Sequence, residues 1–155
     1  MCLEEKLVQL LADNNMSITT VESCTGGLIA GTIVNVAGAS DVFNEGYITY
    51  SNNAKERLVG VSHETLEKYG AVSKETAEEM ARGAALAAGA DVALSSTGIA
   101  GPGGGTKDKP VGLVYIGCYV KGQVKVWRCL FKGNREEVRK QTVETAIKNA
   151  INLIV

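Results

Sequence analysis

One stretch near the N-terminus limits the possible folds more than any other. The β-branched run ITTV at 18–21 leads into ESCTGG at 22–27, and the small-residue pattern LIAGTIV follows at 28–34. We interpret this as a strand, a tight turn and a helix, because paired glycines let a backbone turn sharply and approach a ligand. Such a turn lies at the carboxyl edge of a sheet, where open α/β sheets bind ligands. Two interpretations stay open. Ser23 is a nucleophile beside an oxyanion or phosphate site, or the turn serves only as a helix cap.

The rest of the chain alternates helices and strands. Apolar spacing and boundary residues predict helices near 3–14, 28–36, 54–59, 63–69, 74–88 and 135–155, and strands near 18–21, 42–50, 91–97, 111–120 and 124–131. Ser73 is expected to cap the fifth helix, and Asn134 with Glu137 forms a capping box for the last. Strands separated by helices and closed by a hairpin predict one domain over residues 1–155. Its fold class is a three-layer α/β/α arrangement with a mixed, mostly parallel sheet and a hairpin near the C-terminus.

Three polar segments share one position relative to these strands. Residues 23–27, 50–55 and 97–106 each follow a predicted strand directly. Because the carboxyl ends of parallel strands meet at one edge of a sheet, we expect the three segments to converge there.

Lys55 has two functional interpretations beside the plain one of a solvated helix lysine. It binds a phosphate as a point charge, or burial lowers its pKa until it acts as a base toward Ser23. Tyr50 is either a half-buried strand aromatic or a phenol that takes part in the chemistry.

The segment GIAGPGGGTKDKPVG at 98–112 is dense in glycine. It matches neither a P-loop nor a dinucleotide-binding fingerprint, since Thr106 separates Gly105 from Lys107 and the glycine spacing differs. Glycines at this density still allow a backbone nest for an anion, while a plain surface loop is the alternative. Arg135 and Arg139, at the start of the last helix, are candidates for a phosphate clamp.

Composition excludes several classes of site. The 16 Lys and Arg side chains balance 17 Asp and Glu, so we expect no nucleic-acid partner. The N-terminal segment is acidic and lacks a long apolar core, which predicts no signal peptide, no membrane partner and a cytoplasmic location. The four cysteines form no CxxC pair, so we expect no metal site. His63 is the single histidine, and it sits at a predicted helix start, where a Ser-His-Asp triad is not favoured.

Six motifs in consistent order resemble a known family over nearly the whole chain. They are ESCTGG at 22–27, YSNNAK at 50–55, GAVS at 70–73, TGIAGPGGG at 97–105, KPVG at 109–112 and GNREEVR at 133–139. They are similar to the C-terminal domain of the competence/damage-inducible protein CinA, whose stand-alone versions are nicotinamide-nucleotide amidases. We expect a chain of this length to carry that domain alone. Small departures are Val21 and Asn53, where the family commonly has alanine and an acidic residue.

The resemblance implies hydrolysis of the carboxamide of nicotinamide mononucleotide to nicotinate mononucleotide and ammonia, with no cofactor and no metal. It implies catalytic roles for Ser23 as nucleophile, for Lys55 as its base and for Tyr50. The expected substrate-binding residues are Thr25, Gly26, Gly27, Thr97, Gly98, Gly101, Gly103, Gly104, Arg135 and Arg139. N–H groups around 25–27 are expected to hold the oxyanion. The expected partners are a small-molecule nucleotide substrate and further copies of the same chain.

Two other functions remain open at this point. One is a regulatory module that binds a nucleotide in the same pocket without turning it over. The other is an interaction domain in which the glycines serve only the fold. Release of ammonia separates an enzyme from a binder, and stabilisation by a nucleotide separates a binder from an interaction domain.

Overall fold

The computed structural model describes all 155 residues, and its elements follow the order predicted from the sequence. They are α1 (Leu3–Asp13), β1 (Ile18–Glu22), α2 (Leu28–Val34), the 3-10 turn η1 (Ala39–Asp41), β2 (Tyr47–Ile48), α3 (Asn52–Val59), α4 (His63–Tyr69), α5 (Lys74–Ala88), β3 (Val92–Gly98), β4 (Leu113–Val120), β5 (Gln123–Leu130) and α6 (Arg135–Ile154). The sequence did not predict η1.

The five strands form one sheet in the order β2-β1-β3-β4-β5. Strands β2, β1 and β3 are parallel, β4 runs antiparallel to β3, and β5 is antiparallel to β4. All five residues of β1 are buried, as expected for a parallel strand covered on both faces. The predicted mixed, mostly parallel sheet with a C-terminal hairpin is therefore confirmed.

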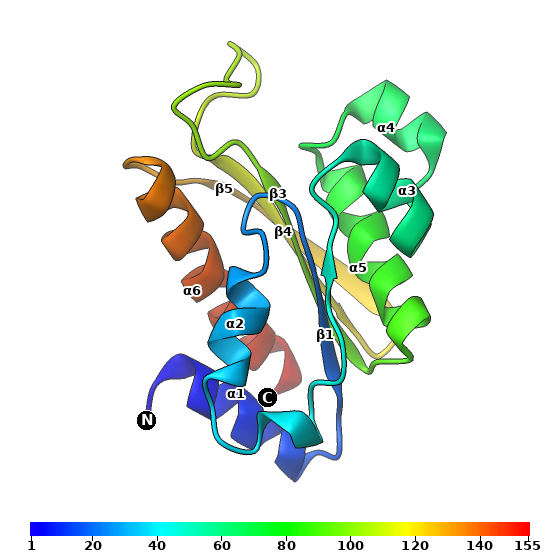
Figure 1. Ribbon diagram of the computed structural model, residues 1–155, viewed down its shortest axis with the longest axis vertical. Helices are drawn as coiled ribbons and strands as arrows, with labels where there is room; N and C mark the ends of the chain where they lie inside the picture. Colours follow the sequence, from blue (N-terminus) through cyan, green and yellow to red (C-terminus); the bar gives the residue numbers. More distant parts are fainter.

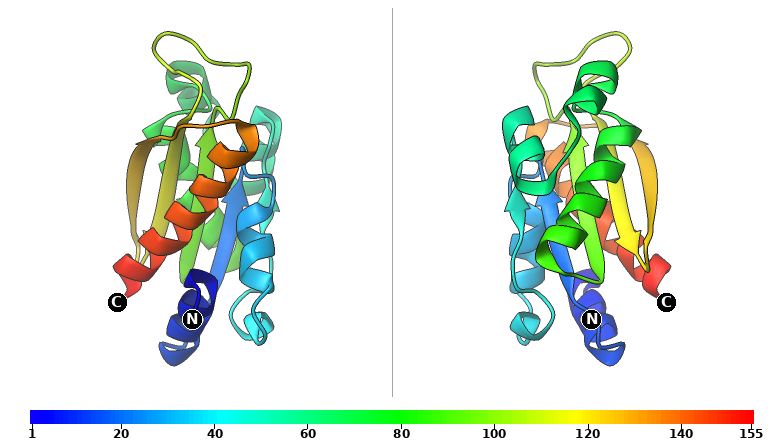
Figure 2. Two further views of the ribbon diagram at one scale, coloured as in Figure 1. Left: turned by 90° about the vertical axis from the view of Figure 1, so that its left-hand side faces the viewer. Right: turned by 90° about the vertical axis from the view of Figure 1, so that its right-hand side faces the viewer.

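Helices cover both faces of the sheet (Figures 1 and 2). Helices α1, α2 and α6 pack on one face, and α3, α4 and α5 lie on the other. The larger hydrophobic cluster lies between the sheet and the α1/α2/α6 layer, and a smaller one lies under α5. None of the helices is long and apolar enough to cross a lipid bilayer.

Three side-chain caps fix where helices begin. Ser51 accepts a hydrogen bond from Ala54 N (3.0 Å) at α3, and Ser73 accepts one from Thr76 N (3.1 Å) at α5. Asn134 and Glu137 form the predicted capping box of α6. Because a cap sets the first turn, it also sets the direction of the side chains that follow, including Lys55 in α3.

Strand β2 is much shorter than the sequence predicted. Only Tyr47–Ile48 form it, and Phe43 makes a single bridge to β1. Thr49 N still donates to β1, but the carbonyl groups of Thr49 and Tyr50 turn out of the ladder and accept hydrogen bonds from Lys55 Nζ. Strand pairing therefore ends where the main chain supplies hydrogen-bond acceptors to Lys55.

Close packing of α3 on α5 yields a stability prediction. A Cβ added at Gly83 in α5 would lie 1.8 Å from the Val59 carbonyl oxygen of α3, whereas one at Gly31 in α2 meets nothing within 4 Å. Gly83→Ala should therefore lower the free energy of unfolding by about 1–3 kcal/mol, because the helices must separate. Gly31→Ala should raise it by up to about 1 kcal/mol, the usual helix preference for alanine. Urea unfolding of both variants measures this, and equal stability of the two would contradict the packing argument.

Candidate active site

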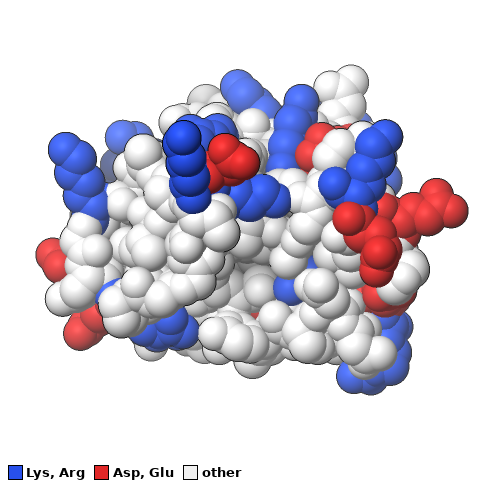
Figure 3. Space-filling view, turned by 90° about the horizontal axis from the view of Figure 1, so that it is seen from above, with Lys and Arg blue, Asp and Glu red and all other residues white.

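A pocket of about 270 Å³ opens at the carboxyl ends of β1, β2 and β3, beneath the glycine-rich loop. Seen from above, Lys and Arg side chains stand beside a mostly uncharged hollow at this end of the molecule (Figure 3). The lining residues are Ser23, Cys24, Tyr50, Lys55, Ala71, Val72, Thr97, Gly98, Ile99, Ala100, Gly101, Gly103, Gly104 and Arg135. The three polar segments singled out in the sequence thus converge at one sheet edge.

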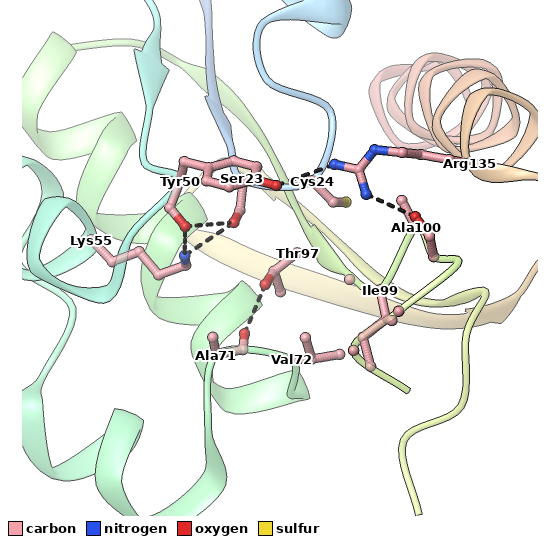
Figure 4. A pocket seen from close by; sticks show the side chains of 14 residues that line it. Ser23, Cys24, Tyr50, Lys55, Ala71, Val72, Thr97, Ile99, Ala100 and Arg135 are labelled. Atoms are coloured by element: carbon pink, nitrogen blue, oxygen red, sulfur yellow. Dashed lines mark hydrogen bonds between the residues drawn. The ribbon is translucent and has the colours of Figure 1, made fainter. Parts of the chain in front are cut away.

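Ser23 and Lys55 are in direct contact at the pocket floor (Figure 4). Ser23 directly follows β1, and its N–H continues the pairing with β3 by donating to Ser96 O at 2.9 Å. Lys55 Nζ lies 3.0 Å from Ser23 Oγ, 2.9 Å from Thr49 O and 3.3 Å from Tyr50 O. The lysine is only 1% exposed and has no carboxylate partner.

The surroundings of Lys55 favour its neutral form. Loss of water around the buried amine lowers its pKa from 10.5 to about 8. A neutral amine has two N–H donors and one lone pair. The carbonyl groups of Thr49 and Tyr50 can take both donors, which leaves the lone pair for the hydroxyl proton of Ser23. This is the hydrogen-bonding arrangement that a base needs next to its nucleophile.

Tyr50 contributes its main chain to the lysine site and its ring to the pocket mouth. Its phenol oxygen accepts a hydrogen bond from Arg135 Nη2 at 3.2 Å, and Arg135 Nη1 donates to Gly101 O at 2.9 Å. No hydrogen bond joins the phenol to Ser23 or Lys55, and Tyr50 is 63% exposed. In Figure 4 the Tyr50 hydroxyl points toward the Arg135 guanidinium, and a dashed line joins them.

The glycine-rich loop forms the opposite wall. At the end of β3, the Thr97 hydroxyl donates to Ala71 O at 2.8 Å, which joins β3 to the segment before α5. Lys109 Nζ donates to Tyr69 O at 2.6 Å, so the far end of the loop is tied to α4. Gly98, Gly101, Gly103 and Gly104, which were expected to bind substrate, all line the pocket.

Three predicted residues of the turn, Thr25, Gly26 and Gly27, lie behind the pocket and do not line it. Thr25 is fully buried, and its hydroxyl donates to Glu22 Oε1 at 2.6 Å and contacts Ser96 Oγ at 2.7 Å. Gly26 and Gly27 have φ of +58° and +105°, a conformation that glycine adopts without strain. Their presence is therefore explained by the backbone of the turn.

The carboxylate of Glu22 occupies the N-terminus of α2, where the sequence suggested that a ligand could bind. Its buried carboxylate accepts hydrogen bonds from Ile29 N at 2.8 Å and from Ala30 N at 3.0 Å in α2. The chain's own carboxylate thus neutralises the start of α2, and the helix does not present these N–H groups to a substrate. Because the partners of Glu22 are main-chain groups, its residue type alone did not indicate this role.

Arg139 is the remaining predicted binding residue outside the pocket lining. Its Nε donates to Cys24 O and its Nη2 to Thr25 O, both at 3.0 Å. It also borders an open groove between α2 and α6. Arg135 alone stands at the pocket mouth, Arg139 lies behind the turn, and both arginines border the groove.

The apolar part of the lining was not predicted from the sequence. Ala71, Val72, Ile99 and Ala100 line the pocket, and no pattern in the chain distinguished them from core residues. Cys24 was also missed, and burial raises the pKa of its thiol to about 11, so Cys24 is protonated at neutral pH.

Other candidate centres lie elsewhere or do not form. His63 is exposed and contacts Glu56 at 3.2 Å and Glu67 at 3.4 Å on the outer helices. No group of three or more His, Cys, Asp or Glu side chains is arranged to hold a metal ion. Ser23 therefore has Lys55, and no histidine, as its neighbour for proton transfer.

Comparison with known proteins places the chain in a family. A family model described as the CinA C-terminal domain matches residues 2–154. The CinA-like protein of Kosmotoga olearia is 56% identical over 145 residues, which make up 94% of this chain and 35% of that protein. The chain spans about a third of the length of the curated relatives it matches, which is 35% for the first of them.

Solved structures agree with this assignment. The competence/damage inducible protein from Agrobacterium tumefaciens has a TM-score of 0.92 and 43% identity, covering 97% of this chain and 94% of that one. The competence-damaged protein (CinA) superfamily protein from Escherichia coli has a TM-score of 0.95 and 36% identity, covering 97% and 88%.

The lowered pKa of Lys55 has a consequence for stability. Between pH 8 and pH 10.5 the unfolded chain keeps the lysine proton while the folded chain loses it, so wild-type stability rises with pH in that window. Lys55→Met removes the titration. The difference in free energy of unfolding should therefore shift in favour of the wild type as pH rises from about 8 to 10.5. Urea unfolding over this range measures the shift, with Lys140→Met as the exposed control. If the difference in free energy of unfolding did not change with pH, folding would not lower the pKa of Lys55.

Proposed function

Because the chain belongs to the CinA C-terminal domain family, and because a buried lysine faces a serine hydroxyl in its pocket, we propose that it is an amidase. The proposed reaction converts nicotinamide mononucleotide and water to nicotinate mononucleotide and ammonia. The observation that carries the proposal is the 3.0 Å contact between Lys55 Nζ and Ser23 Oγ, with no carboxylate to hold the amine charged. An isolated surface serine would lack both the base and the dry surroundings that make a hydroxyl nucleophilic.

The proposed first step uses the neutral lysine. Ser23 Oγ attacks the carboxamide carbon, its proton passes to Lys55 Nζ, and the carbonyl oxygen becomes an oxyanion. The C–N bond then breaks, and the protonated lysine returns the proton so that ammonia leaves. Water attacks the acyl-enzyme in the same way, which frees Ser23 and the carboxylate product. No step requires a metal ion.

Tyr50 takes a different part from that expected of a catalytic phenol. Its carbonyl group helps to orient Lys55, while its ring and hydroxyl stand at the pocket mouth with Arg135. We assign the ring to substrate contact. Proton transfer is assigned to Lys55 alone, which already contacts the nucleophile.

The pocket walls suit the two ends of the proposed substrate. Val72, Ile99 and Ala100 offer an apolar surface for a flat pyridine ring close to Ser23. At the mouth, Arg135 retains unused N–H donors beside the glycine-rich loop, and these can bind a phosphate. The ring and phosphate ends of a mononucleotide thus have complementary walls, which supports a nucleotide amide as the substrate.

Removal of the nucleophile should separate binding from chemistry. We expect purified protein to release ammonia from nicotinamide mononucleotide and Ser23→Ala to release none. The variant should bind the substrate within about tenfold of wild-type affinity, since tenfold is about 1.4 kcal/mol and the phosphate contacts lie elsewhere. A coupled ammonia assay and calorimetry measure the two effects. Tight binding by the wild type without ammonia release would instead indicate a regulatory nucleotide-binding module.

The base role of Lys55 predicts a pH profile. Below the pKa of about 8 the amine is charged and cannot accept the Ser23 proton, so kcat/KM should rise with pH through an apparent pKa near 8. Lys55→Arg keeps the positive charge but cannot lose its proton, so turnover should fall to background. Steady-state kinetics from pH 6 to pH 10 check both effects. A Lys55→Arg enzyme that retains most of the wild-type kcat and only gains a higher KM would show that Lys55 holds phosphate.

A further inference from the structure

Arg139 makes an unusual pair of contacts for an arginine that has no acidic partner. Its guanidinium spans the two consecutive carbonyl groups that follow the proposed nucleophile, Cys24 O and Thr25 O, each at 3.0 Å. No carboxylate lies within ion-pair distance of it. The side chain also lies against the turn itself, because a Cβ at Gly26 would be 3.5 Å from Arg139 Nη2. Its charge is thus directed at the peptide groups of the turn.

The contact with Arg139 also fixes the orientation of peptide groups on the other side of the turn. In a planar trans peptide the N–H points opposite to the C=O. Because Arg139 holds Thr25 O, the N–H of the same peptide unit, that of Gly26, points away from the arginine. It donates to Ser23 O at 3.2 Å. This hydrogen bond orients the peptide unit that joins Ser23 to Cys24. In that unit the Cys24 N–H points opposite to Ser23 O.

The Cys24 N–H at the end of this series donates to no carbonyl group and to no side chain of another residue. Cys24 lines the pocket and directly follows Ser23, and it is 7% exposed. An unpaired backbone donor in such a dry place costs free energy unless a ligand satisfies it. The position after a nucleophile is also where a backbone donor can reach the oxyanion that forms on the attacked carbon.

We propose that Arg139 is a positioning residue that acts through two peptide groups to aim and polarise the Cys24 N–H, the donor for the oxyanion. This deepens the proposed amidase function and rests on it. Hydrogen bonds in series strengthen one another, and a cation at the start of the series increases the positive charge on the last N–H. Arg139 lies outside the pocket lining, in contrast to Arg135 at the pocket mouth.

Two measurements test this proposal on the intact chain. The first is the kcat and KM of Arg139→Ala with nicotinamide mononucleotide. The second is the rate at which a fluorophosphonate probe labels Ser23. In that reaction Ser23 Oγ bonds to phosphorus, fluoride leaves, and the hydroxyl proton passes to Lys55. Both reactions develop negative charge on an oxygen beside Cys24 N–H, and the second needs no nucleotide.

We expect Arg139→Ala to lower kcat and the labelling rate by about 10- to 100-fold, less than the loss of a whole oxyanion donor. KM should stay within about threefold, and the pH profile should keep its midpoint near the Lys55 pKa of about 8. Arg139→Lys should also be slowed by at least about threefold, since one ammonium cannot match the two-carbonyl fork. Lys140→Ala, on the same helix and exposed, is the control with wild-type kinetics.

Each outcome is decisive. If Arg139→Ala and Arg139→Lys label Ser23 at the wild-type rate, Arg139 is a structural latch and the inference is wrong. If Arg139→Ala fails to fold by thermal unfolding, the labelling rate of Arg139→Lys decides alone. A wild type that labels but releases no ammonia refutes the proposed function, while the labelling ratio still judges Arg139. A wild type that neither labels nor turns over refutes both.

Discussion

The whole site depends on one buried amine that has no counter-ion. A lysine taken out of water loses much of its hydration, and a neighbouring carboxylate would restore the charged form. Here the partners of Lys55 are two carbonyl groups and a hydroxyl, all uncharged. They bind the amine well enough to fix its position, yet they do not hold its proton as an anion would. A surface lysine would be fixed less firmly, and a paired one would remain an acid.

Several local features of the fold hold that amine in place. Strand β2 stops after two residues, and this early end turns the carbonyl groups of Thr49 and Tyr50 toward Lys55. Ser51 caps α3 directly afterwards, so the first turn of the helix points Lys55 inward. On the far side, the absence of a side chain at Gly83 lets α3 pack closely on α5. Strand end, helix cap and helix packing therefore act together on a single side chain.

The sequence predicted the scaffold and the proximity of Ser23 and Lys55 better than it predicted the supporting contacts. Hydrophobic periodicity and caps such as Ser73 and Asn134 are local, so the order of the elements and the convergence of three loops could be read from the chain. The early end of β2 could not, because all four residues from Tyr47 to Tyr50 favour a strand, and the sequence does not show that Lys55 takes the carbonyl groups of Thr49 and Tyr50. Glu22 and Arg139 act on main-chain groups, which every residue has, so residue type gives no sign of their partners.

Glu22 and Lys55 lie on opposite faces of the sheet because side chains alternate along a strand. Glu22 and Ser23 are neighbours in the chain, so they point to opposite faces of the sheet. Glu22 faces α2, where Ile29 N and Ala30 N donate to its carboxylate. Ser23 faces α3, where it contacts Lys55. A shift of one residue in the register of β1 would bring the carboxylate to the lysine, raise the pKa of the amine and remove the base. The glutamate directly before Ser23 therefore has its carboxylate on the face of the sheet opposite to Lys55.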